Sequence, residues 1–137
     1  MILYGAAYLA TLAVFVLADM VWLGTMASRL YRPTLGEIAL SGVNLPPAFA
    51  FYILYPVGVV VFAILPALKG GSILMALFYG VLFGFFTYAT YDLTNQATLR
   101  NWTFQLTLID VAWGSALAAS AAAAGYAVAS RINQMNS

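Results

Sequence analysis

Four apolar segments, each long enough to cross a lipid bilayer, constrain the fold of this chain more than any other feature. They cover roughly residues 2–27, 47–68, 71–92 and 104–129. A helix needs about 20 apolar residues to cross the hydrocarbon core, and an open sheet edge is not stable in lipid. We therefore expect an all-α fold, an integral membrane four-helix bundle that forms a single membrane domain over residues 1–137.

The composition excludes several functional classes. The chain is 64% hydrophobic and only 7% charged, whereas soluble domains have about 25% charged residues. Five basic residues are too few to follow a phosphate backbone, so we expect no nucleic-acid partner. The chain has no cysteine and no histidine, which removes thiol and imidazole chemistry and most transition-metal sites. We expect no cofactor and no metal.

An even number of spans places both ends of the chain on one side of the membrane and loops 1 (28–46) and 3 (93–103) on the other. Arg29, Arg32 and Arg100 lie on the side of these two loops, against Lys69 and Arg131 on the opposite side. The positive-inside rule, applied to this small difference, predicts that loops 1 and 3 are cytoplasmic.

Loop 1 contains a helix signal of its own. Pro33 is followed by Thr34, and Glu37 comes three residues after Thr34, which is the spacing of a capping box. We expect a short interfacial helix over about 34–41, either as a surface connector or as a lid over a site.

Polar residues gather at one depth of the predicted bundle. From the helix rise, Asp19 lies about 12 Å and Asp110 about 9 Å below the surface on the side of loops 1 and 3. The same leaflet half receives Asp92, Tyr52, Tyr55, Tyr88 and Tyr91. A carboxylate in hydrocarbon costs several kcal/mol unless it is paired, hydrated or protonated, so Asp19 and Asp110 should face the bundle interior. The two acids are therefore candidates for a functional site. The alternative is a structural role, in which their hydrogen bonds to neighbouring helices only hold the bundle together.

A repeated pattern links the first and last spans. "DMVW" (19–22) and "DVAW" (110–113) both read Asp-x-x-Trp, which places acid and indole on one helix face. The two helices run antiparallel, so we expect Asp19 to meet Trp113 and Asp110 to meet Trp22.

The end of the third span and loop 3 are the most polar stretch of the chain. Asp92 stands where that helix should end, and a negative charge is unfavourable there. Arg100 is the nearest basic residue along the chain and the expected partner of Asp92. We expect Asn95, Arg100 and Trp102 to lie over a site whose floor is formed by Asp19 and Asp110.

Small residues indicate how the helices pack. Gly80 and Gly84 form a Gly-xxx-Gly pair, and Gly114, Ala118 and Ala122 form a second stripe. Such surfaces permit close backbone contact, and we expect contact within the chain rather than between two copies. Proline 56, within the second span, should kink its helix.

Four segments together resemble the bacterial membrane family called domain of unknown function family 2177. They are "DMVWLG" (19–24), "FYILYPVGVVVF" (51–62), "YATYDLTNQATLRNW" (88–102) and "DVAWGS" (110–115). The resemblance implies a multi-pass protein of the bacterial inner membrane. It also implies motif positions at Asp19, Trp22, Tyr52, Tyr55, Tyr91, Asp92, Thr94, Asn95, Arg100, Trp102, Asp110, Trp113 and Gly114.

The family name assigns no function, so function must be argued from the residues. We expect a protein that binds or transports a small molecule or lipid through the acidic and aromatic site. Its ligand-binding residues would be Asp19, Trp22, Tyr52, Tyr55, Tyr88, Tyr91, Asp92, Asn95, Arg100, Trp102, Asp110 and Trp113. One alternative is an enzyme that modifies a lipid, which the lack of histidine and of a nucleophile–base pair disfavours. The other is an accessory subunit of a larger membrane complex, with a second copy or another membrane protein as partner.

Overall fold

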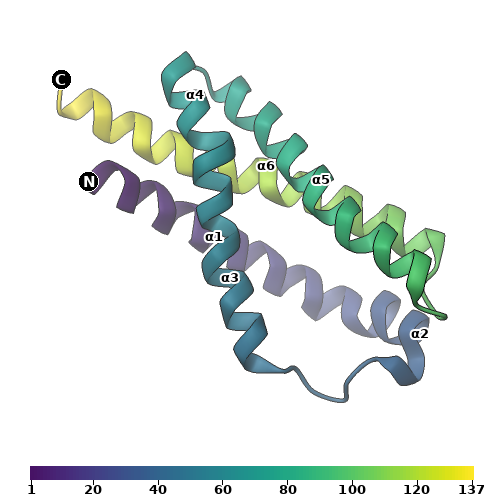
Figure 1. Ribbon diagram of the computed structural model, residues 1–137. Helices are drawn as coiled ribbons and strands as arrows, with labels where there is room; N and C mark the ends of the chain where they lie inside the picture. The colour runs from purple at the N-terminus through teal and green to yellow at the C-terminus, as the bar shows by residue number, and fades with distance from the viewer.

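The computed structural model describes residues 1–137, and it consists of helices and short connections (Figure 1). Its elements are α1 (Ile2–Met26), α2 (Arg32–Leu35), α3 (Leu45–Val59), α4 (Leu65–Gly70), α5 (Ile73–Thr98) and α6 (Phe104–Met135). They make four helical stretches long and apolar enough to cross a membrane: Ile2–Ile38, Leu45–Gly70, Ile73–Thr98 and Phe104–Met135. The all-α, four-helix fold predicted from the sequence is confirmed.

Helix α1 ends at Met26, close to the predicted end at residue 27, but the helical stretch of the first span continues to Ile38. A π-helical turn, Ala27–Tyr31, joins α1 to α2, and a 3₁₀ turn, Gly36–Ile38, follows. The short helix in loop 1 therefore begins earlier than the expected 34–41 and ends earlier. The predicted cap is wrong, since Thr34 lies inside α2 and makes no capping bond. Proline 33 stands in the first turn after the π turn, where its missing N–H is tolerated.

The second span is also interrupted by a wide turn. Val60–Ile64 forms a π-helical turn between α3 and α4. Pro56, which is predicted to kink this span, lies inside α3, and the π turn begins one helical turn after it. Pro66 stands in the first turn of α4, where proline fits best.

The third span extends beyond the predicted end at residue 92. Helix α5 continues to Thr98, with the hydroxyls of Thr94 and Thr98 bonded to carbonyls one turn earlier. Asp92 is therefore an interior position of a helix and not its last residue. Helix α6 begins after Thr103, whose side chain accepts the backbone N–H of Leu106 as an N-cap.

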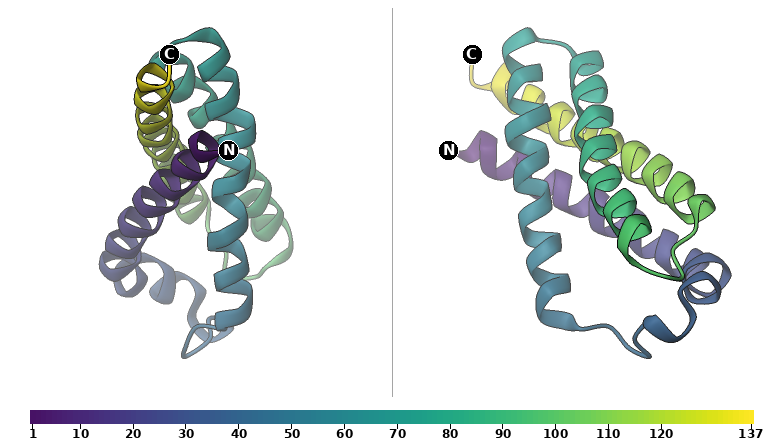
Figure 2. Two further views of the ribbon diagram at one scale, coloured as in Figure 1. Left: turned by 90° about the vertical axis from the view of Figure 1, so that its left-hand side faces the viewer. Right: turned by 45° about the vertical axis from the view of Figure 1, so that its right-hand side comes forward.

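Helix α6 is the central element, and α1 and α5 both pack along it (Figures 1 and 2). The two chain ends and the α4–α5 turn lie at one end of the bundle, and the two longer loops lie at the other (Figure 1). A Cβ added at Gly84 would clash with the Gly114 carbonyl, and one at Gly80 would meet the backbone of Ala119. The predicted close packing of these small residues within the chain is confirmed.

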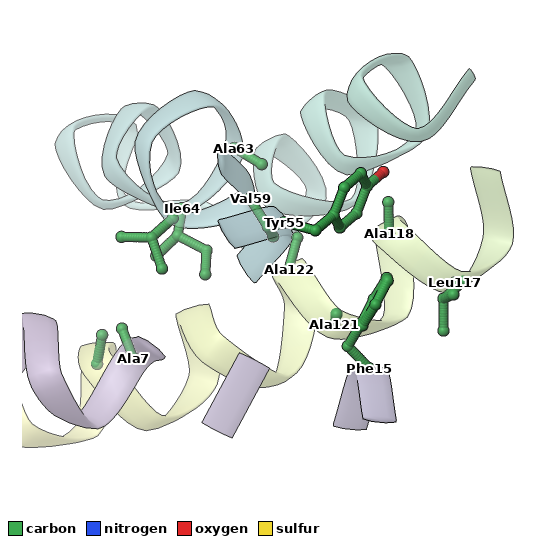
Figure 3. Packing of buried hydrophobic residues seen from close by; sticks show 12 residues of the cluster. Ala7, Phe15, Tyr55, Val59, Ala63, Ile64, Leu117, Ala118, Ala121 and Ala122 are labelled. Atoms are coloured by element: carbon green, nitrogen blue, oxygen red, sulfur yellow. The ribbon is translucent and has the colours of Figure 1, made fainter. Parts of the chain in front are cut away.

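The interior of the half of the bundle that contains the chain ends is mainly apolar, with Thr11 as a buried polar residue. Figure 3 shows Ile64 and Ala7 on one side of this cluster, and Phe15, Tyr55 and Ala121 toward the other. The Phe15 and Tyr55 rings stack with their centroids 4.9 Å apart. Large apolar side chains also cover the outside of every span, as expected for a surface that faces lipid. This half therefore provides a tightly packed base below the polar groups.

Candidate functional site

Asp19 projects from α1 into the bundle and is 7% exposed. One carboxylate oxygen accepts the Tyr52 hydroxyl from α3 at 2.5 Å, and the other accepts the Trp113 indole N–H from α6 at 3.2 Å. Three helices thus meet at one carboxylate, and both of its oxygens have donors. The contact between Asp19 and Trp113 expected from the Asp-x-x-Trp repeat is confirmed.

Asp110, on α6, is held in a related way, but through a residue that the sequence analysis did not select. The Tyr31 hydroxyl donates to Asp110 Oδ1 at 2.5 Å, and the Trp22 indole N–H donates to the same hydroxyl at 2.8 Å. The expected direct bond from Trp22 to Asp110 is wrong, because the π turn after α1 places Tyr31 between them. The two indoles, Trp22 and Trp113, stack at 4.4 Å with planes 5° apart.

Asp92 is the third acid, and its side chain is the most completely buried of the three. It is fully buried, and neither of its carboxylate oxygens has a hydrogen-bond donor. The polar group that it meets is the carboxyl of Asp110. Two carboxylates in contact repel each other, and a proton on one of the two carboxyl groups allows them to bond.

Arg100, the expected partner of Asp92, is exposed, and the structure contains no salt bridge. Eight residues of helix and turn separate it from Asp92, a distance of about 12 Å along a helix axis. Because α5 continues past Asp92, Arg100 lies at the end of the bundle while Asp92 points inward against α6. That part of the prediction is wrong.

A cavity of about 510 Å³ lies between the four spans at the end nearer loops 1 and 3. Seven predicted site residues line it: Asp19, Tyr55, Tyr88, Tyr91, Trp102, Asp110 and Trp113. Trp22, Tyr52 and Asp92 lie behind this lining and contact it through the bonds and contacts described above. Asn95 and Arg100 are outside the lining.

Tyr88 stands among the charged groups of this cavity. Its ring packs directly over Gly114, where an added Cβ would clash with it. Its hydroxyl makes no bond to the protein, in contrast to those of Tyr31, Tyr52 and Tyr55. Gly114 therefore provides the space that lets Tyr88 lie between α5 and α6 at the level of the acids.

The family model described as "Predicted membrane protein (DUF2177)" matches residues 4–127. The chain belongs to this family. No curated protein and no solved structure matches the chain. In this DUF2177 protein, polar residues from all four spans lie together at one end of the bundle.

Five lining residues of this DUF2177 protein were missed by the sequence analysis: Leu23, Tyr31, Leu35, Phe51 and Thr87. Three are ordinary apolar residues that no sequence pattern distinguishes from lipid-facing ones. Thr87 accompanies Tyr88 in "TYATYD" and bonds the Tyr55 hydroxyl at 2.9 Å. Tyr31 could have been found only by continuing the first helix through loop 1, because its direction depends on the π turn.

Proposed function

We propose that this protein binds an amphipathic molecule in the cavity between its four spans. The observation that carries the proposal is the combination of two carboxyl groups and a mostly apolar lining in one cavity. Nine of the twelve lining residues are hydrophobic, and Asp19 and Asp110 provide the charge. A lining that is mainly apolar with a few converging polar groups is typical of small-molecule sites.

Binding fits this arrangement better than passage across the membrane. Below the acids, Phe15 and Tyr55 stack, and small residues such as Ala121 and Ala122 fill the space between the helices. A transport path would need polar groups or water at this depth. A single polar half above a packed apolar half is what a membrane-embedded binding protein requires.

A lipid-modifying enzyme is the second candidate, and the contact of Asp92 with Asp110 favours it. Paired carboxyl groups can act as general acid and base. Lipid profiles of cells that lack the protein, complemented with wild type or with Asp92→Asn, test this role. An altered lipid species restored by wild type alone supports an enzyme, and identical profiles argue against one.

We place the protein in the bacterial inner membrane with loops 1 and 3 in the cytoplasm. The chain has no cysteine, so single cysteines at Glu37 and Ser137 report the two sides without further changes. We expect a membrane-impermeant thiol reagent to label Ser137→Cys in intact spheroplasts and Glu37→Cys only after lysis. The opposite pattern would reverse the orientation.

The native tryptophans provide the binding test. Trp102 and Trp113 line the cavity, and Trp22 stacks on Trp113. A terminally brominated dodecyl maltoside, added to the protein in nanodiscs, should quench this fluorescence in a saturable way. Leu23 lines the cavity, whereas Leu17 on the same helix faces outward.

Leu23→Phe should therefore weaken the saturable quenching, and Leu17→Phe should leave it unchanged. Both variants must first retain the thermal midpoint of the wild type within a few degrees. Quenching that rises linearly with probe in all three proteins would mean that the probe dissolves in lipid and does not occupy the cavity.

A further inference from the structure

We infer that the ligand carries a positively charged ammonium head group on an apolar chain, and that Asp110 holds this head group. The inference rests on the proposed binding function and specifies the chemistry of its ligand. It comes chiefly from three features of the molecule, to which its open acceptors and aromatic lining add support. The three features are the hydrogen-bond donors that the protein has already used, the position of its basic residues, and an apolar groove that continues from the cavity.

The donors of the site are almost all engaged within the protein. The three indole N–H groups donate to Tyr31, Thr107 and Asp19. The Tyr31 and Tyr52 hydroxyls donate to the two carboxylates. A molecule that enters the cavity therefore finds few donors, and one of them is the hydroxyl of Tyr88, which has no partner in the protein.

Acceptors, by contrast, are in excess. Asp19 has a donor on each oxygen, but Asp110 receives a bond on Oδ1 alone. Asp110 lines the cavity, and no N–H or hydroxyl group of the protein donates to its Oδ2. A ligand that donates hydrogen bonds or carries positive charge satisfies this oxygen, and an anionic head group would be repelled by it.

No basic side chain of the protein neutralises the charge of these acids. The five lysine and arginine residues form no salt bridge, and none of them lines the cavity. Three carboxyl groups thus share one half of the bundle with no cation from the protein. Unpaired charge in a membrane interior is costly, and a bound cation removes part of that cost.

The aromatic lining suits the same kind of head group. Tyr88, Tyr91, Trp102 and Trp113 surround the acids within the cavity, and Tyr91 meets Trp102 edge to face at 5.6 Å. Ammonium groups are attracted to the faces of such rings within about 6 Å of the ring centre. Groups of aromatic rings are a common recognition site for quaternary ammonium ligands.

The chain of the ligand has a place outside the cavity. A second hollow of about 630 Å³ lies along α5, and Phe62 of the π turn that follows α3 completes its lining. Its aromatic and aliphatic residues include Leu82, Phe83 and Phe86. Thr87 lines both the cavity and this groove. An alkyl chain can therefore pass beside Thr87 from the head-group site to the lipid-facing groove.

The test uses three terminally brominated dodecyl probes that differ only in the head group: trimethylammonium, maltoside and sulfate. We expect the trimethylammonium probe to quench the native tryptophan fluorescence at about tenfold lower concentration than the maltoside, with the sulfate weakest. In Asp110→Asn this preference should fall about tenfold, because the charge-assisted contact is lost. In Glu37→Gln, which neutralises the exposed acid of loop 1, it should remain.

Each other outcome overturns a definite part of the inference. Saturable quenching of equal strength by all three probes would leave the binding function intact and refute the ammonium head group. A preference that survives in Asp110→Asn would refute the role of Asp110. If tetramethylammonium, which has no chain, displaces the brominated probe at equal concentration, the ligand is a small cation and the groove plays no part.

Discussion

Trp113 on α6 donates its indole N–H to Asp19 on α1, across 94 positions of sequence and a distance of 3.2 Å. The same carboxylate accepts the hydroxyl of Tyr52 from α3. The hydrogen bonds of this one carboxylate therefore connect three of the four spans at the depth of the cavity. Removing either donor should affect both the stability of the bundle and the shape of the site.

Tyr52→Phe tests the stability part of this statement. It leaves one oxygen of a nearly buried carboxylate without a donor, which should destabilise the protein by about 1–3 kcal/mol. We expect a lower thermal midpoint, followed by tryptophan fluorescence in detergent. Tyr4→Phe is the matched control, because Tyr4 is exposed and makes no hydrogen bond through its side chain. Equal midpoints for the two variants would show that the Tyr52 bond contributes nothing.

Gly114→Ala should move Tyr88 out of its place over α6, since the added methyl group occupies the position of the ring. Weaker binding of the brominated probes and a lower thermal midpoint should follow. Gly24→Ala is the control, because nothing lies within 4 Å of its added Cβ. That change should be neutral or slightly stabilising, as alanine is favoured within helices. Wild-type binding in Gly114→Ala would contradict the placement of Tyr88.

The Trp22–Tyr31–Asp110 chain can be tested with a double-mutant cycle of Trp22→Phe and Tyr31→Phe. Bonds in one network are not additive, so the coupling free energy should be about 1 kcal/mol. It is measured from chemical unfolding of the four proteins in the same detergent. A coupling of zero would mean that the indole and the phenol act independently.

Asp92 should be a position where the wild-type residue lowers stability. Asp92→Asn supplies N–H donors to the facing Asp110 carboxyl, and we expect its thermal midpoint to rise. Giving a hydrogen-bond partner to a buried polar group that lacks one should raise the free energy of unfolding by about 1–3 kcal/mol. Glu37→Gln should leave the midpoint unchanged. A clear loss of stability in Asp92→Asn would show that Asp92 has a partner that its surroundings do not reveal.

The sequence predicted the large features of this fold because the membrane imposes them. Apolar length determined the four spans, and the antiparallel order of the first and last spans predicted the contact of Asp19 with Trp113. Small residues on α5 and α6 predicted their close packing. Each of these follows from local pattern and the geometry of straight helices.

The errors arose where helices continued or changed register. Asp92 was expected at a helix end beside Arg100, but α5 continues to Thr98. The hydroxyls of Thr94 and Thr98 bond backbone carbonyls in this last part of the helix. Tyr31 was missed because a π turn directs its ring toward Asp110. Neither hydropathy nor residue spacing determines where a π turn forms, so these parts of the site required the structure.

The most direct measurement is an experimental structure with the brominated dodecyltrimethylammonium probe. We predict that its nitrogen lies between Asp110 and the ring of Tyr88, and that anomalous bromine signal appears in the groove beside Phe83 and Phe86. A cavity that contains only water, with the probe bound elsewhere on the lipid-facing surface, would contradict the account.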